Sequence, residues 1–216
     1  MGNIFIDFDM GVPQISCTDC IKCDSIIGRS LCNITDRGCC HYFPEFTLVD
    51  IQRMAILEGG LNALDMVLSN PGTIINNFNL YSKGLFDKEA HDQYITMEYT
   101  MDAGNIKDHT IFFRTCPFVI PGFGCKLPIR FRTTVCNFFI CAEILERTDL
   151  QDDLKIYMVE RSRYARWIYR ESGTLQHILD ENKLNLISNL SAAIDLLAQI
   201  NPSCYEFPSL ESISYV

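Results

Sequence analysis

The stretch Cys39-Cys40-His41-Tyr42-Phe43-Pro44-Glu45-Phe46-Thr47-Leu48-Val49-Asp50-Ile51 joins two adjacent thiols to the start of a helix. Thr47 followed by Asp50 is typical of a capping box, with Asp in place of the usual Glu. Apolar residues then recur at helical spacing until Gly59-Gly60, which is a helix stop. The stretch therefore predicts a helix that begins shortly after the vicinal cysteines.

Four parts of the chain differ in their local patterns. Residues 1–46 are cysteine-rich and irregular after a short strand at 3–8, and residues 47–85 read as helical, with a second helix at 61–68 and a further turn or two through 74–80. Residues 91–141 read as β-rich, with strands at 91–100 and 110–113 and a turn at 102–105. Residues 142–200 predict two helices, one from 154 to a stop near Gly173 and one over 184–197, before an irregular tail beyond Pro202.

These patterns predict an α+β fold, with a small, irregular, cysteine-rich layer organised by metal, a short sheet and several helices. We expect one domain over 1–216, with a cysteine-cluster region at 17–141 and a helical part at 142–200.

Composition excludes several classes of function. The 216 residues are 48% hydrophobic and carry a net charge of −9, so binding of nucleic acid through the bulk charge is not expected. No apolar run reaches the ~18 residues of a membrane span, and the first residues show no secretory leader. We therefore expect a cytoplasmic protein with no membrane partner; a protein or peptide partner is left unidentified.

Cysteine is the outlier, with 11 residues. In a reducing cytosol, clustered thiols bind metal more often than they form disulfides. Ten of them form two groups, which we predict to be metal ligands: Cys17, Cys20, Cys23, Cys32, Cys39 and Cys40, and then Cys116, Cys125, Cys136 and Cys141.

The spacing favours an iron–sulfur cluster, with zinc as the alternative. A Cys17-x2-Cys20-x2-Cys23 run brings three thiolates to one small volume, as in bacterial ferredoxins, which points to a 4Fe-4S cubane completed by a distant thiolate. A second site, cluster or zinc, can draw on the later cysteines and one of the vicinal pair. Disulfides and buried free thiols stay open as alternatives, and His41 is either a ligand or an ordinary packing residue.

Two arginines lie between predicted ligands. Arg130 and Arg132 fall between Cys125 and Cys136, and we predict that they bind the cofactor by donating hydrogen bonds to sulfur. A second basic stretch, residues 161–170, reads either as an anion-binding patch or as the solvated side of a helix.

Two blocks of the sequence resemble a known family. Cys39-Cys40 leading into Thr47-Leu48-Val49-Asp50-Ile51, and Cys116-Pro117-Phe118-Val119 followed by Cys125 and by Cys136, are similar to blocks of the YkgJ-like cysteine-cluster family of zinc- or iron-chelating domains. The match covers roughly residues 17–141. It departs from the family pattern where Cys17, Cys20 and Cys23 precede the vicinal pair at a distance, and where Arg132-Thr133 replaces Arg-Pro.

The resemblance implies a metal-chelating role. Combined with the spacing, it predicts a metal-binding protein with a structural or electron-transfer role. A flagellin lysine methylase is similar to this family over the cysteine blocks, so a cluster-dependent enzyme that modifies a peptide or protein is a second prediction, and a purely structural zinc protein is a third.

Overall fold

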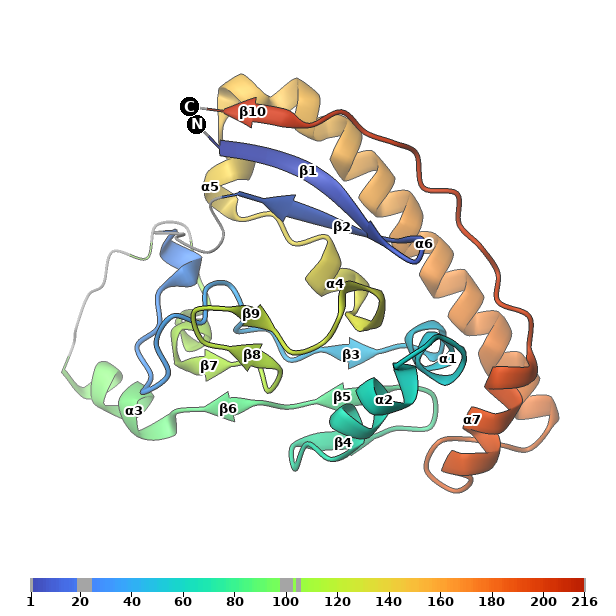
Figure 1. The fold of residues 1–216 in the computed structure, drawn as a ribbon. Helices are drawn as coiled ribbons and strands as arrows, with labels where there is room; N and C mark the ends of the chain where they lie inside the picture. The colour runs from blue at the N-terminus through green and yellow to red at the C-terminus, as the bar shows by residue number, and fades with distance from the viewer. Residues whose placement is uncertain (1, 19–24, 98–102, 104–105, 216) are drawn as a thin grey trace.

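The structure, a computed structural model, describes residues 2–18, 25–97, 103 and 106–215. The fold is α+β, as the sequence predicts. Figure 1 shows two small antiparallel sheets on opposite sides of the β8–β9 hairpin and helix α4, with the long helix α6 running behind the β10–β1–β2 sheet and down towards α7. The two ends of the described chain lie side by side, because strand β10 pairs with β1.

The helices and strands follow in chain order. They are β1 (Gly2–Asp9), β2 (Val12–Cys17), β3 (Glu45–Phe46), α1 (Leu48–Ile56), α2 (Gly60–Leu68), β4 (Thr73–Ile75), β5 (Leu80–Ser82), β6 (Leu85–Phe86), α3 (Lys88–Thr96), β7 (Arg114–Thr115), β8 (Val119–Ile120), β9 (Gly124–Cys125), α4 (Thr134–Asn137), α5 (Ala142–Leu145), α6 (Gln151–Glu181), α7 (Leu190–Gln199) and β10 (Ile213–Tyr215). Short 3-10 turns occupy Ile26–Gly28, His109–Phe113, Ile129–Phe131 and Thr148–Leu150.

One sheet has the order β10–β1–β2, and all its pairs are antiparallel. The tight turn between β1 and β2 places Met10 at φ 50° and Gly11 at φ 79°, so the turn uses the left-handed region that a hairpin reversal requires. Ile4 and Ile15 point into the core. A second sheet, β3–β5–β4, follows from the turn at Asn70-Pro71-Gly72 and carries the fully buried Leu80.

Helix α1 begins at the predicted capping box. The Thr47 N–H donates to Asp50 Oδ2 at 2.8 Å, and the Asp50 N–H donates to Thr47 Oγ1 at 3.4 Å. Ile51 and Met54 are fully buried against the core, so the capped end fixes how the preceding cysteine turn enters it.

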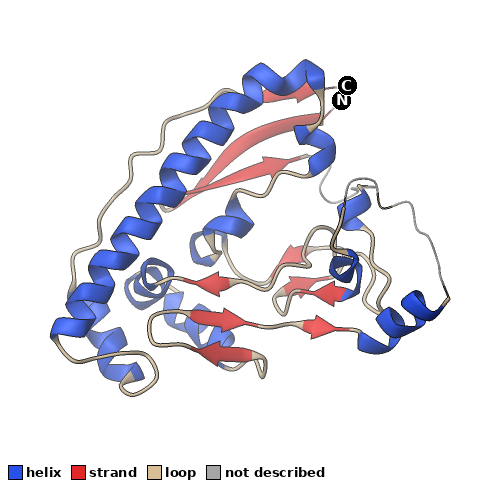
Figure 2. Cartoon of the chain, turned by 180° about the vertical axis from the view of Figure 1, so that it is seen from behind, coloured by secondary structure: helices blue, strands red, loops and turns tan. Residues whose placement is uncertain are grey.

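Helix α6 and the tail that follows α7 frame the molecule. In Figure 2 the segment 201–212 runs along α6, from the α7 end to β10. Ser203 Oγ donates to Glu171 Oε2 at 2.6 Å, and Tyr157 Oη donates to the Glu211 carbonyl at 2.6 Å. The ring of Tyr205 meets that of Tyr164 at 5.2 Å, so the tail is held by aromatic packing as well as by hydrogen bonds.

Three predicted elements were wrong in type. Residues 74–80, expected to be helical, form β4 and the start of β5, because β-branched Thr73-Ile74-Ile75 follow the turn and Asn76 N–H closes a tight turn on Asn79 O at 3.0 Å. Residues 91–96 of the strand expected at 91–100 lie instead in α3, where Asp87 caps the helix by accepting from Ala90 N–H at 3.0 Å, and residues 98–100 fall outside the described residues. The strand expected at 110–113 is a 3-10 turn started by Asp108.

The C-terminal boundaries also differ. Helix α6 continues through Gly173 to Glu181, because a lone exposed glycine costs about 1 kcal/mol and Leu175 and Leu179 are buried beyond it. The next helix begins at Leu190 rather than at 184. The tail is irregular as predicted, except that its end forms β10. The turn expected at 102–105 falls outside the described residues, apart from Ala103.

No helix in the part of the chain that the structure describes combines the length and the apolarity that crossing a membrane demands.

Replacing Thr47 with Ala tests the capping box. Thr47→Ala removes the hydroxyl that accepts from Asp50 N–H and donates to Asp50 Oδ2 at 2.9 Å. The free energy of unfolding, measured by urea denaturation, should fall by about 1–2 kcal/mol. Thr47→Ser keeps the hydroxyl and should stay within about 0.5 kcal/mol of the parent; equal losses in both variants would contradict this account.

Candidate metal centre

Four thiols from four separate chain segments lie close enough to influence one another's charge. Cys40, Cys116, Cys125 and Cys136, called here the first thiol group, interact electrostatically with one another. They come from the turn before β3, the end of β7, strand β9 and helix α4. The structure therefore brings one cysteine of the vicinal pair together with three of the four distal ones.

A backbone hydrogen bond ties the two cysteine-bearing regions. The Cys116 N–H donates to the Cys40 carbonyl at 2.8 Å, although 76 residues separate them in the sequence. Cys40 is itself held in a turn, because its N–H donates to the Arg37 carbonyl at 3.2 Å while Gly38 adopts φ 54°. This main-chain hydrogen bond therefore brings the backbones of Cys40 and Cys116 together.

The β8–β9 hairpin places the next thiol. The Val119 N–H donates to the Cys116 carbonyl at 3.3 Å, and Val119 pairs with Cys125 across the hairpin. The reversal uses Gly122 at φ 74° and Gly124 at φ 116°, which are conformations that L side chains rarely adopt. The two cysteines, which are separated by eight intervening residues in the sequence, therefore sit at the base of one small hairpin.

Helix α4 supplies the fourth thiol from its first turn. Thr133 caps the helix, and its hydroxyl lies 3.4 Å from Cys136 Sγ, to which it donates. Asn137 side-chain nitrogen donates to the Ile129 carbonyl at 3.1 Å and fixes the helix on the preceding turn.

Two guanidinium groups face the first thiol group. Arg132 donates to the Leu127 carbonyl at 2.8 Å and to Gln14 Oε1 at 2.6 Å, and it also hydrogen-bonds Cys125. Arg37 is only 2% exposed and donates to the carbonyls of Arg29 and Ile111. Their positive charges are the local compensation for ionised thiols.

The pKa values of the four thiols diverge. A hydrogen bond from Cys39 is the main reason that the pKa of Cys40 is lowered to about 7, with help from the charges of Arg132 and Arg37. Burial raises the pKa of Cys116, and the neighbouring thiols raise it further. Burial also raises the pKa of Cys125, against the effect of Arg132. Burial raises the pKa of Cys136 as well, although this residue is partly exposed and water offsets part of the effect.

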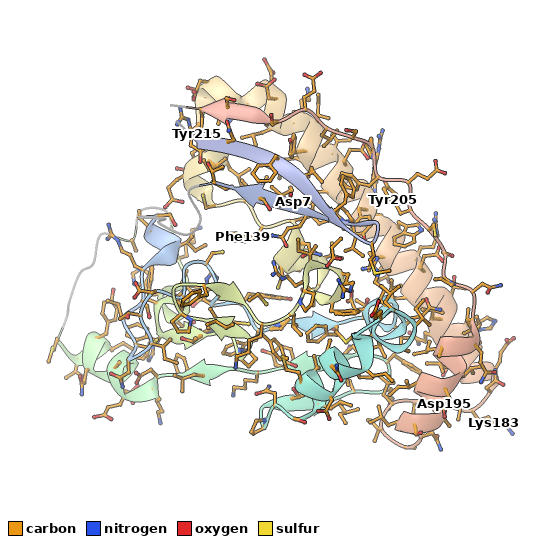
Figure 3. All side chains as sticks on the ribbon, viewed as in Figure 1. Asp7, Phe139, Lys183, Asp195, Tyr205 and Tyr215 are labelled. Atoms are coloured by element: carbon orange, nitrogen blue, oxygen red, sulfur yellow. The ribbon has the colours of Figure 1, made fainter. Side chains whose placement is uncertain are left out.

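A second thiol group lines a separate small cavity. Cys17, Cys39 and Cys141 surround a volume of about 60 Å³ together with apolar side chains of β1, β2 and the segment before α5. Phe139 of that segment is labelled in Figure 3, between the β10–β1–β2 sheet and the β8–β9 hairpin. The adjacent cysteines of the vicinal pair therefore serve different groups, Cys39 the second and Cys40 the first.

Other predicted site residues lie apart from these groups. Cys32 is buried with Ser30 Oγ at 3.0 Å and Thr115 Oγ1 at 3.3 Å as its neighbours. Arg130 pairs with Asp9 at 2.8 Å and donates to the Glu58 carbonyl, so its contacts are with an acid and a carbonyl. Cys20 and Cys23 lie outside the described residues.

His41 adjoins both groups in sequence and is mostly buried. Burial, followed by the nearby charges of Arg37 and Arg114, lowers the pKa of His41 to about 4, so the ring is neutral at pH 7. No described residue hydrogen-bonds its buried Nδ1. A neutral imidazole with an unused nitrogen is chemically suited to ligation, and the two interpretations of His41 given above both stay open.

The thiols fit a metal by their chemistry but are not arranged around one as they stand. No disulfide joins any two of the nine described cysteines. Among the described residues, no three Cys, His, Asp or Glu side chains are placed so that they could hold an ion. Thiols are nevertheless the donor type that zinc and iron–sulfur clusters take in proteins.

Sequence reasoning missed two participants. Arg37 gave no signal, because a lone arginine in a loop of turn formers looks like a surface residue. Tyr215 lies in a tail that carries no pattern, yet its hydroxyl is 2.9 Å from Cys17 Sγ. Both act across long sequence separations, which local patterns do not encode.

No protein-family model, curated protein or solved structure matches this chain. The resemblance to the YkgJ-like family therefore stays a prediction that rests on the two cysteine blocks quoted above.

Alkylation of the metal-free protein tests the lowered pKa of Cys40. Mass spectrometry of iodoacetamide-treated protein should show Cys40 reacting with a midpoint near pH 7 while Cys116 stays largely unmodified. Cys39→Ala removes the main cause of the lowering and should move the midpoint upward. Cys204→Ala, in the exposed tail, is the control and should leave it in place; a midpoint indifferent to Cys39 would refute the assignment.

The buried His41 predicts an acid-sensitive fold. The pKa of His41 is about 4 when folded, against 6.5 ordinarily, so between these values the unfolded chain binds more protons. Stability should therefore drop, by on the order of 2 kcal/mol, as the pH falls from 6.5 to 4. His41→Gln should flatten that part of the stability curve, whereas His177→Gln on the exposed face of α6 should not. Identical curves for all three proteins would be inconsistent with a buried neutral ring.

Proposed function

We propose that this chain is a metal-binding cysteine-cluster protein, with an iron–sulfur cluster as the first candidate for its cofactor. The observation that carries the proposal is the convergence of Cys40, Cys116, Cys125 and Cys136 from four chain segments. A buried thiol that serves only as a small apolar side chain does not need other thiols as neighbours.

The electrostatics of the first thiol group call for a cation. Neighbouring thiols of the group oppose the ionisation of Cys116, Cys125 and Cys136, and Arg132 offsets this in part for Cys125 and Cys136. Four thiolates brought together at one site would repel strongly unless a metal neutralised them, and a coordinating thiol is deprotonated outright. Metal binding would therefore release protons and would couple to the folding of the segments that supply the ligands.

The second thiol group extends the proposal. Cys17, Cys39 and Cys141 offer three thiols that line one cavity, and Cys20 and Cys23 follow Cys17 in the sequence, outside the described residues. Ser25 lines the same cavity, and Cys23 is two residues from it in the sequence. The Cys17-x2-Cys20-x2-Cys23 run is what favours a cubane here over zinc.

The proposed role is structural or electron-transferring. A bound cluster would supply cross-linking of the chain and one-electron redox capacity. The chain's own residues would orient it: Arg132 donates to Cys125, Thr133 donates to Cys136, and Cys136 keeps an exposed edge. The thiol-rich composition suits a reducing compartment, and we place the protein in the cytoplasm.

Anaerobic purification followed by absorption spectroscopy and metal analysis tests the proposal. We expect brown protein with a broad band near ~400 nm, acid-labile sulfide and iron. Cys116→Ser and Cys125→Ser should each lose the metal of the first thiol group.

The matched control is Cys204→Ser, which changes an exposed cysteine outside both groups and should keep the full metal content. Colourless protein with stoichiometric zinc would keep the metal-binding proposal and replace the cluster with zinc. Protein that holds neither metal after anaerobic reconstitution, or whose metal content ignores Cys116 and Cys125, would overturn it.

A further inference from the structure

We infer that Tyr215 is a positioning residue for the second thiol group, holding the sulfur of Cys17 by a hydrogen bond from its hydroxyl. Tyr215 Oη lies 2.9 Å from Cys17 Sγ, and the tyrosine is only 9% exposed. The inference rests on the proposed function, because only that proposal makes Cys17 a metal ligand that the Tyr215 hydroxyl could orient.

The sheet is built so that this contact can form. Tyr215 in β10 pairs with Gly2 in β1, and Cys17 in β2 pairs with Ile4 in β1. The ring must therefore cross the central strand to reach the thiol, as the position of Tyr215 beside β1 in Figure 3 illustrates. A Cβ on Gly2 would lie 2.3 Å from the Tyr215 ring, so only glycine leaves room for this path.

A positive charge makes the hydroxyl a stronger donor. The Arg147 guanidinium lies 5.2 Å from the centre of the Tyr215 ring. It is kept in place by Asp149, 2.7 Å away. A cation over the face of a phenol withdraws charge from the ring and polarises the O–H bond.

The bond acquires a direction when the sulfur is ionised. In the thiol form either atom can donate, but a thiolate can only accept, so the tyrosine must then be the donor. Such charge-assisted bonds are roughly twice as strong as neutral ones. The hydroxyl would thus do little for an empty thiol and much more for Cys17 bound to a metal, which is the behaviour of a group that orients a ligand.

Cobalt(II) titration of the metal-free protein tests the inference. Tyr215→Phe keeps the ring and removes only the hydroxyl, so we expect Co²⁺ binding to the second group to weaken about 10–100-fold. The sulfur-to-cobalt absorption bands should also move to lower energy, because the sulfur lone pairs lose a stabilising donor. Tyr205→Phe is the matched control, since its hydroxyl faces Glu160 and no thiol.

A double-mutant cycle with Cys17→Ser separates action through sulfur from general damage to the sheet. If Tyr215 acts through Cys17, Tyr215→Phe should have no additional effect on cobalt binding in the Cys17→Ser protein, with thermal unfolding of each protein recorded alongside. Tyr215→Phe protein that matches Tyr205→Phe in affinity and spectrum while binding cobalt would overturn this inference alone. Parent protein that binds no cobalt would overturn the proposed function together with it.

Discussion

The hydrogen bond from the Cys116 N–H to the Cys40 carbonyl is the constraint on which the candidate metal centre depends. At 2.8 Å it joins the turn that precedes β3 to the segment that leads into the β8–β9 hairpin. Because it is made by the main chain, it holds whatever the protonation of the thiols. Within the vicinal pair, Cys40 belongs to the first thiol group and Cys39 lines the cavity of the second, while a hydrogen bond joins the two side chains. One turn of chain therefore positions two thiol groups at once.

The apolar core makes this constraint possible without help from metal. Phe46 and Phe118 meet edge to face at 5.9 Å directly beside the two cysteine segments, and both rings are buried. Helix α6 and the tail along it close the far side. The thiols are thus carried by segments that pack without metal. The conflict that remains is the repulsion between neighbouring thiols when they ionise. A metal that resolves this conflict would add stability in the region where the described elements are shortest.

The sequence predicted the parts of this structure that have local causes. The capping box at Thr47, the turn at Pro71-Gly72 and the core stripe of α6 each depend on residues within one or two turns of chain. The strand predicted at 91–100 was wrong over 91–96, which lie in α3, because the cap supplied by Asp87 outweighs the loose alternation of the sequence. For the site, residue type and spacing made the cysteines, Arg130 and Arg132 candidates, and their roles stay predictions. Type and spacing could not show which cysteines lie together, or that Arg130 forms an ion pair with Asp9. They also gave no sign of Arg37 and Tyr215, because these contacts arise only when distant segments of the chain pack together.

X-ray absorption at the metal edge of the anaerobically purified protein measures the central claim most directly, since it counts the atoms bound to the ion. The account predicts a first shell dominated by sulfur, with about four sulfur neighbours per metal at about 2.3 Å. A shell of nitrogen and oxygen alone would contradict it, as would a metal-free protein whose cysteines of the first thiol group are found by mass spectrometry to be paired in disulfides.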